Sequence, residues 1–258
     1  MKCSCIPALL LAVLHSASLV MCYSAESKDK PGWKLTFQDE FDGNALNIQK
    51  WNPNDPWGRE RNNELQAYVT NAFEVKDGIL LIRAEKREAF YDGKRRAFTS
   101  GMMATYRKFS QEYGRFEIRC RVPKGKGLWP AFWLLPEPLA WPPEIDVLEI
   151  LGHEPNKVYM THHFRDEQKA HKSDGGEWAG PDFSKEFHEF AVEWSPEKIV
   201  WFVDGVERFR STKSIPHGKM YMLVNLAVGG DWPKAPDENT KFPCAMEVDY
   251  VRVYQRLP

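Results

Sequence analysis

The sequence predicts an all-β fold, an antiparallel sandwich or barrel, on two observations. Short runs rich in β-branched and aromatic residues recur along the chain, bounded by Gly, Pro, Asn and Asp at the spacing typical of such folds. Helical periodicity is nowhere sustained beyond about two turns. Because no repeat, low-complexity linker or shift in composition divides the 258 residues, we expect one domain over 26–258.

Nine runs are expected to form the strands. One of them contains Asp204 and Gly205, a dipeptide that signals a tight hairpin turn. In chain order the runs are 78–86, 113–122, 131–136, 144–150, 157–164, 187–195, 198–210, 220–228 and 245–255.

Apolar and charged side chains alternate along 113–122. This period of two predicts a strand with one buried face and one polar face. The apolar set is Phe116, Ile118, Cys120 and Val122, and the charged set is Arg115, Glu117, Arg119 and Arg121.

The segment around 131–136 is apolar on both faces. Trp129 and Trp133 share one side, while Phe132 and Leu134 share the other. If the second set faces the core, the two tryptophans lie on the exposed face and form a stacking platform inside a cleft. The alternative is burial of both faces between two layers.

Three carboxylates in the run 144–150 have a spacing that does not fit a regular strand. Glu144 and Asp146 share a face, whereas Glu149 is an odd number of residues from both and should project oppositely. Either Glu149 is a solvated residue of the other face, or an extra residue bulges out after Asp146 and turns all three acids toward one surface.

In the bulged form, the acids suit glycoside hydrolysis by the retaining route. Acids gathered on one face repel one another, so stability gives no reason to assemble them. The retaining reaction needs two carboxyl groups about 5 Å apart, one ionised to attack and one protonated to donate. An intervening Asp146 can orient the nucleophile and help to separate the two pKa values. Nearby rings, including Trp141, are what sugar C–H faces pack against.

Charge and composition exclude several classes of partner. The formal charge is −1 with acids and bases interspersed, so no basic face indicates nucleic acid and no polybasic run indicates anionic lipid. The 10 Trp, 9 Tyr and 15 Phe include many in turn-like segments, which favours flat surfaces offered to an uncharged ligand over a purely structural role.

The first 25 residues are typical of a secretory signal peptide. Lys2 precedes a short apolar stretch that ends in small residues. The apolar run is too short for a membrane-spanning anchor, so we expect a secreted, extracellular or periplasmic protein. A lipid anchor through Cys22 is the alternative, although Met21 stands where a small residue is usual.

Removal of 1–25 would leave two cysteines, Cys120 and Cys244. In an exported protein they could form a disulfide, and two isolated buried thiols are the alternative. Neither has a partner at metal-ligand spacing, which argues against a zinc site.

The chain as a whole resembles glycoside hydrolase family 16, in its laminarinase-like branch of endo-β-1,3-glucanases. The resemblance implies a β-jelly roll of two curved antiparallel sheets with a concave substrate cleft. It also implies a β-glucan polysaccharide as partner, no cofactor for catalysis, and a monomer. The segments that carry it run from "FQDEFDG" (37–43) to "VDYVRVYQ" (248–255) and include "KWN" (50–52), "NNELQAYV" (62–69), "WPAFWLLP" (129–136), "EIDVLE" (144–149) and "NLAVGGDWP" (225–233).

By resemblance, the three acids take separate roles. The family has a regular E-x-D-x-E strand and a bulged E-x-D-x-x-E strand, and this chain has the bulged spacing. Glu144 matches the nucleophile, Asp146 the assisting acid and Glu149 the general acid/base.

Further positions match the family's substrate-binding residues. His163 matches a His near the acids, although the adjacent His162 leaves the register uncertain by one residue. The alternative for each position is a loop-packing role. The expected set is Asn63, Glu64, Trp129, Trp133, Trp141, His163 and Trp232.

Glu40, the Gly78 carbonyl and Asp249 match segments that often hold a structural calcium in this family. Oxygen-only ligands suit that ion. Ordinary turn hydrogen bonds are the alternative.

The leading hypothesis is therefore an endo-acting retaining hydrolase of β-1,3- or mixed β-1,3/1,4-glucan. One departure leaves the polymer open, since many laminarinases have Gly directly before the first catalytic Glu and this chain has "WPPEID". A hydrolase of agar- or carrageenan-type galactans is the second hypothesis, with Arg59, Arg61 and Arg107 as candidate sulfate ligands. A non-catalytic glucan-binding protein is the third.

Overall fold

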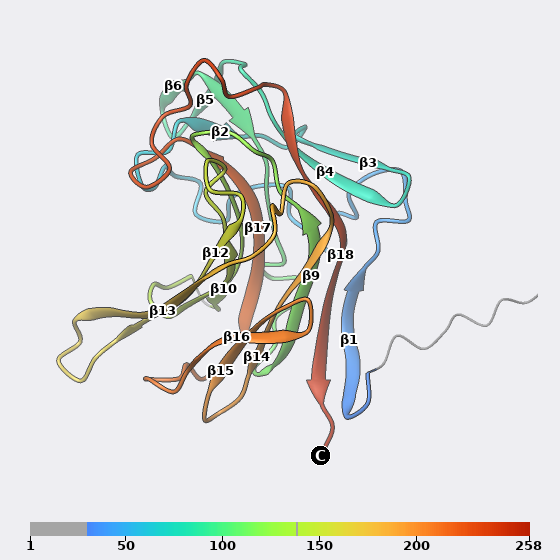
Figure 1. Cartoon of the computed structure of the whole chain (residues 1–258), viewed down its shortest axis with the longest axis vertical. Coiled ribbons are helices and arrows are strands. Elements are labelled where there is room, and N and C mark those ends of the chain that lie inside the picture. Colours follow the sequence, from blue (N-terminus) through green and yellow to red (C-terminus); the bar gives the residue numbers. More distant parts are fainter. Residues whose placement is uncertain (1–29, 138) are drawn as a thin grey trace, which may run out of the picture.

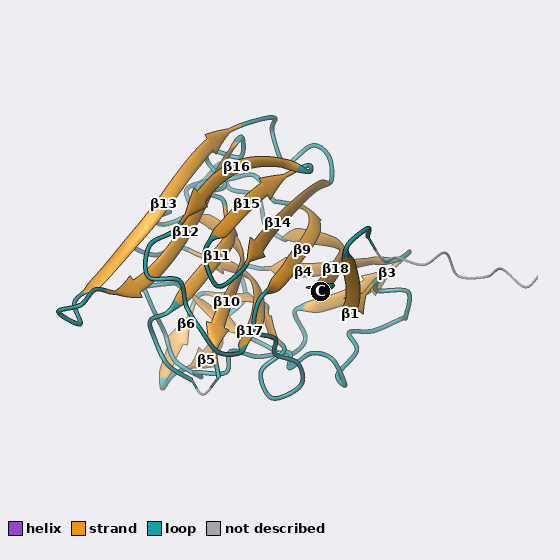
Figure 2. Cartoon of the chain, turned by 90° about the horizontal axis from the view of Figure 1, so that it is seen from below, coloured by secondary structure: helices purple, strands orange, loops and turns teal. Residues whose placement is uncertain are grey.

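The computed structural model describes residues 30–137 and 139–258. The expected signal peptide at 1–25 and the expected lipidation site at Cys22 lie outside these residues and stay predictions. The described part of the chain contains strands and no helices, as predicted (Figures 1 and 2). No helix of that part has the length and hydropathy needed to span a membrane.

An eight-stranded antiparallel sheet forms one layer. Its order is β16-β15-β14-β9-β18-β4-β3, and β1 also pairs with β18, beside which it lies in Figure 1. The strands are β1 (Trp33–Asp39), β3 (Phe73–Lys76), β4 (Ile79–Ala84), β9 (Gly114–Arg121), β14 (His188–Trp194), β15 (Ile199–Val203), β16 (Val206–Ser211) and β18 (Cys244–Arg256).

A six-stranded antiparallel sheet forms the other layer, in the order β13-β12-β11-β10-β17-β8. Figure 1 shows β17 as a strongly curved ribbon within it. Its strands are β8 (Met102–Ala104), β10 (Leu128–Pro136), β11 (Glu144–Glu149), β12 (Lys157–Arg165), β13 (His171–Ala179) and β17 (Met220–Val228). Two short pairs flank the sheets: β2 (Gln66–Tyr68) with β7 (Phe98–Ser100), and β5 (Ala89–Tyr91) with β6 (Lys94–Arg96).

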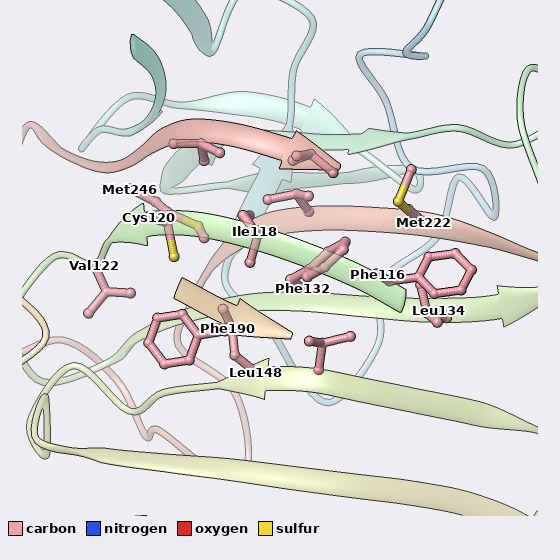
Figure 3. Close-up of a cluster of buried hydrophobic side chains, with 14 of the residues drawn as sticks. Phe116, Ile118, Cys120, Val122, Phe132, Leu134, Leu148, Phe190, Met222 and Met246 are labelled. Atoms are coloured by element: carbon pink, nitrogen blue, oxygen red, sulfur yellow. The ribbon is translucent and has the colours of Figure 1, made fainter. Parts of the chain in front are cut away.

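The core lies between the two sheets. Figure 3 shows Phe116 and Ile118 from β9 gathered with Phe132 and Leu134 from β10, and all four side chains are fully buried. The predicted alternation along β9 and the predicted core face of β10 are both confirmed, because a strand facing one core must present every second side chain to it.

The other face of β9 is more buried than its sequence indicates. Glu117 is 0% exposed and Arg115 is 6% exposed. Arg115 forms ion pairs with Glu117 at 2.8 Å, with Glu189 at 2.8 Å and with Glu193 at 3.0 Å. The charged face of β9 is therefore partly buried, because the long charged side chains of neighbouring strands cover it and form ion pairs with one another.

The two cysteines are free thiols. Cys120 lies in the core and Cys244 is partly exposed. Burial raises the pKa of both thiols, to about 12 for Cys244. The alternative of isolated thiols describes this structure, and the disulfide does not form in it.

Eight strands of the described part were not among the nine expected runs: β1, β2, β3, β5, β6, β7, β8 and β13. The sequence of β13, "HKSDGGEWA", has little apolar content, and most of its residues are exposed. Pairing with β12 holds it in a long hairpin that extends away from the rest of the molecule in Figure 1. Main-chain hydrogen bonding to a neighbour, rather than hydrophobic alternation, defines this strand.

Phe132→Ala is expected to lower the free energy of unfolding by about 3–5 kcal/mol, because the ring fills the space between the sheets and nothing replaces it. Equilibrium unfolding in urea measures the loss. Ile48→Ala is the control, since Ile48 is 62% exposed and its truncation should change stability by no more than about 0.5 kcal/mol. Equal losses in the two variants would contradict the description of the core.

Candidate active site

Strand β11 has the predicted bulge. Asp146 pairs with Thr161 of β12, and the next pair is Glu149 with Tyr159. The chain advances three residues on β11 for two on β12, so one extra residue restores the parity of Glu149. Glu144, Asp146 and Glu149 consequently line one cleft.

The cleft has a volume of about 730 Å³ and lies on the face of the six-stranded sheet that points away from the core. Strands β10, β11, β12 and β17 form its floor, and residues 57, 59–62 and 64 line it as well. Nine of the ten predicted catalytic or substrate-binding residues line it: Glu64, Trp129, Trp133, Trp141, Glu144, Asp146, Glu149, His163 and Trp232.

Asn63 is the tenth, and it does not line the cleft. Its side chain is exposed and donates to the Asp231 carboxylate, with distances of 2.9 and 3.1 Å to the two oxygens. The neighbouring Asn62 lines the cleft instead. Both asparagines have φ near +55°, a left-handed turn that reverses the direction of successive side chains and that a sequence motif does not reveal.

Each outer glutamate accepts a hydrogen bond from an indole of the cleft. Trp141 Nε1 donates to Glu144 Oε2 at 3.1 Å, and Trp129 Nε1 donates to Glu149 Oε1 at 3.1 Å. The predicted stacking platform on β10 is therefore also a hydrogen-bond donor to one of the acids.

His163 faces the acids, which resolves the uncertain register. Its Nε2 lies 3.7 Å from Glu144 Oε1 and 3.4 Å from Asp146 Oδ2, while its Nδ1 lies 3.0 Å from Nε2 of His171 on β13. His162 projects to the core side and is fully buried, and burial lowers its pKa to about 4.

Burial raises the pKa of all three acids, but their neighbours act differently. For Asp146, burial raises the pKa from 3.8 to about 7. For Glu144, burial and the Asp146 charge raise the pKa, while His163 and the Trp141 N–H oppose the rise. For Glu149, burial and the charges of both other acids raise the pKa, and only the Trp129 N–H opposes it. The surroundings thus favour ionisation of Glu144 ahead of Glu149.

Trp133 is held by a chain of hydrogen bonds under the cleft. Its Nε1 donates to Asn225 Oδ1 at 2.8 Å, Asn225 Nδ2 donates to the Tyr68 hydroxyl at 3.1 Å, and Tyr68 donates to Glu64 Oε2 at 3.2 Å. Burial raises the pKa of Glu64, against the hydrogen bond from Gln66. The chain fixes the orientation of the indole and joins it to a carboxylate of the cleft wall.

Trp232 belongs to an aromatic cluster at one end of the cleft. Its ring is edge-on to Trp129, with centroids 5.5 Å apart, and to Tyr159, with centroids 4.7 Å apart. Because Trp232 is 38% exposed, it still presents apolar surface to a ligand.

Sequence reasoning missed several of these residues. Asn225 has a signal that could have found it, since it is the one polar residue within the apolar run "MYMLVNLAV". Tyr68, Tyr159 and His171 have none, because their positions depend on strands that are distant in sequence.

The residues expected to bind calcium have other partners. Arg252 donates to both carboxylate oxygens of Glu40, at 2.9 and 2.8 Å, and Arg119 forms an ion pair with Asp249. Because arginines already neutralise both carboxylates, this donor set, with the Gly78 carbonyl, does not fit a calcium ion. Among the described residues, one group has ligand atoms within 4.8 Å of one another, namely Glu144, Asp146 and His163. Retaining hydrolysis by carboxyl groups uses these atoms without a metal.

Comparison with known proteins gives concordant matches. The family model described as "Glycosyl hydrolases family 16" matches residues 61–252. Endo-1,3-1,4-beta-glycanase EglC of Rhizobium meliloti (strain 1021) is 39% identical over 242 residues, covering 85% of this chain and 51% of EglC, so the chain spans about half of that relative. The beta-glucanase of Rhodothermus marinus is 36% identical over 284 residues, covering 96% of this chain and 93% of the relative.

The fold has a match among solved structures. The laminarinase catalytic domain from Thermotoga maritima MSB8 superposes with a TM-score of 0.79 at 34% sequence identity, covering 88% of this chain and 99% of that domain. The predicted jelly roll of two antiparallel sheets is confirmed.

Asp146→Asn is expected to stabilise the fold at pH 8 and to have much less effect at pH 4. The pKa of Asp146 is raised on folding, so the unfolded chain releases this proton first, and stability falls as pH rises from about 4 to about 7. The amide does not ionise, which removes that loss. The gain at pH 8 should exceed about 1 kcal/mol, the equivalent of one pKa unit.

Urea unfolding of wild type and variant at both pH values measures this difference. Asp77→Asn is a matched control, because Asp77 is exposed at a turn where Asn is equally suited. A pH-independent effect of Asp146→Asn would show that the folded state does not hold this proton.

Proposed function

The chain belongs to glycosyl hydrolase family 16, and we propose that it is an endo-acting retaining hydrolase of β-1,3- or mixed β-1,3/1,4-glucan. One observation carries the proposal: a bulged strand places Glu144 and Glu149 in a single cleft, each beside an indole donor and with Asp146 between them. Two carboxyl groups flanking a sugar-binding cleft are the machinery that retaining hydrolysis requires.

In the first step, Glu149 acts as the acid and Glu144 as the nucleophile. The Glu149 carboxyl gives its proton to the glycosidic oxygen as the C–O bond breaks, and the Glu144 carboxylate bonds to the anomeric carbon. The part of the chain that held the glycosidic oxygen leaves as an alcohol. The different electrostatic surroundings support this order of roles, because Glu149 retains its proton when Glu144 is ionised.

In the second step, Glu149 acts as the base. The carboxylate left by the first step takes a proton from water, and the water oxygen bonds to the anomeric carbon as the bond to Glu144 breaks. Glu144 is again a carboxylate and Glu149 is again protonated. Asp146 lies between the two glutamates on β11, and His163 contacts both Glu144 and Asp146, so these two residues orient Glu144.

The charge of the cleft favours a neutral polymer over a sulfated galactan. Of the three arginines expected to bind sulfate, Arg107 does not line the cleft. Arg61 forms an ion pair with Asp55 at 3.0 Å, and Arg59 lies over the Trp57 ring at 5.2 Å. A sulfate would have to compete for Arg61 and would find a cleft lined by five carboxyl groups.

The two glutamate roles predict products of opposite configuration when azide replaces a missing carboxylate. With an activated aryl β-glucoside, Glu144→Ser should give the α-glycosyl azide, because azide then attacks directly from the vacant nucleophile side. Glu149→Ala should give the β-glycosyl azide, because azide then attacks the glycosyl–Glu144 intermediate from the opposite side. NMR of the products distinguishes the two anomers.

Without azide, both variants should lose at least about 100-fold of polymer hydrolysis. Asp231→Ala is a control outside the reacting groups and should retain the configuration of the wild-type product. The same azide anomer from both glutamate variants would refute the assignment of roles.

The substrate prediction concerns the polymer. Laminarin or barley mixed-linkage glucan should yield a ladder of short oligosaccharides, because neutral glucose units suit the indole surfaces of Trp129, Trp133 and Trp141. Agarose and κ-carrageenan should yield none. Chromatography of each digest makes the measurement, with the Glu144→Ser variant as the blank. Preferential cleavage of a galactan would overturn the substrate while sparing the mechanism, and tight glucan binding without hydrolysis would favour a binding protein.

A further inference from the structure

The bulge in β11 leaves the main chain after Asp146 outside the regular ladder. On the β10 side, Asp146 pairs with Trp133 and Leu148 pairs with Phe132, so the intervening residue has no partner. The peptide group that joins Asp146 to this residue lies at the bulge, and a buried main-chain acceptor there is unfavourable without a hydrogen-bond donor.

The donor comes from the opposite sheet. Trp201 lies on β15, and its indole Nε1 donates to the Asp146 carbonyl oxygen at 2.8 Å through the core. Strands β11 and β15, which Figure 2 labels, belong to different layers of the fold. We propose that Trp201 is a positioning residue for the catalytic acids, acting through the bulge; this rests on the proposed hydrolase function.

Trp201 is suited to hold one geometry. Its side chain is 0% exposed, and its ring packs against Phe209 with centroids 5.2 Å apart. An indole confined in this way has one direction in which its N–H can point, so it fixes the direction of the Asp146 carbonyl.

On the cleft side Asp146 interacts with the Glu144 carboxyl and with His163. Its Oδ2 is buried and has no hydrogen-bond partner among the described residues, and His163 Nε2 lies 3.4 Å away. One of its two oxygens thus has no hydrogen-bond partner in the described part of the chain, so the position of this carboxylate also depends on the main chain that carries it. Rotation of the peptide after Asp146 would move Glu149 relative to Glu144 and Asp146, since the bulge lies between Asp146 and Glu149.

The consequence is a specific kinetic effect. The cleft walls that bind the polymer come from other segments, so loss of the Trp201 hydrogen bond should leave KM within about threefold of wild type. Displacement of the acids should lower kcat by about 10–100-fold, the scale expected when reacting groups shift by about 1 Å.

The chain offers a matched control in Trp194. It is 2% exposed, lies on the adjacent strand β14, and donates from Nε1 to the Pro216 carbonyl at 3.1 Å. Pro216 does not line the cleft. Trp194→Phe thus removes a buried indole-to-carbonyl bond of the same type without touching the bulge.

The experiment compares Trp201→Phe and Trp194→Phe in the full chain. We expect both to lose similar stability in urea, and only Trp201→Phe to lose kcat on the polymer that wild type cleaves. Replacement of Trp201 by benzothienylalanine, in which sulfur takes the place of the N–H in the same bicyclic ring, separates the lost bond from any cavity. It should reproduce the loss of kcat.

Hydrogen exchange provides a readout that is independent of activity. The amides of 147–149 should exchange faster in the Trp201 variants than in wild type or in Trp194→Phe. Unchanged kcat and unchanged exchange in the benzothienylalanine protein would overturn the positioning role. A wild-type protein that is inactive on every glucan would instead overturn the proposed function, whatever the exchange shows.

Discussion

The alternation of side chains along a β-strand constrains how one strand can carry this site. Three acids spaced as Glu144, Asp146 and Glu149 cannot share a face of a regular strand, so the cleft depends on one extra residue in β11. That residue interrupts the ladder with β10 and β12 and creates main-chain groups whose partners must come from outside the sheet. The indole of Trp201, which reaches across the core, supplies one such partner. The shape of the reactive surface is in this way tied to the packing between the two layers.

The three buried acids of the cleft also destabilise the fold when they ionise. Burial raises the pKa of all three, which means that ionisation of each one opposes folding as pH rises. The core must offset this destabilisation, and it does so with large side chains that are fully excluded from water on the inner faces of both sheets. The charges of the other layer are arranged differently: Arg115 forms ion pairs with Glu117, Glu189 and Glu193, so those acids have a guanidinium partner and the cleft acids have indoles and a histidine instead.

How much could be predicted from sequence depended on whether the deciding interaction was local. The core faces of β9 and β10 followed from counting residues within one strand, and counting together with the resemblance to the family predicted the bulge in β11. The burial of Glu117, the strand at β13 and the exchange of Asn63 for Asn62 in the cleft did not, because each depends on a segment far away in the chain or on a left-handed turn. The arginine partners of the expected calcium ligands could not be predicted for the same reason, since Arg119 and Arg252 lie on strands whose pairing the motif does not encode.

The tryptophans of the cleft combine two tasks that are usually considered separately. In the proposed function Trp129 and Trp141 offer ring faces to a sugar, and their indole N–H groups also lower the pKa of Glu149 and Glu144, respectively. A sugar that stacks on either ring and shifts it therefore changes a hydrogen bond to the acid that acts on that sugar. Sugar binding and the proton affinity of each glutamate are coupled through the indole that contacts both. The glutamates of the occupied cleft therefore need not carry the same charges as those of the empty cleft. The tryptophans of the cleft therefore contribute to the electrostatics of the site as much as to its shape.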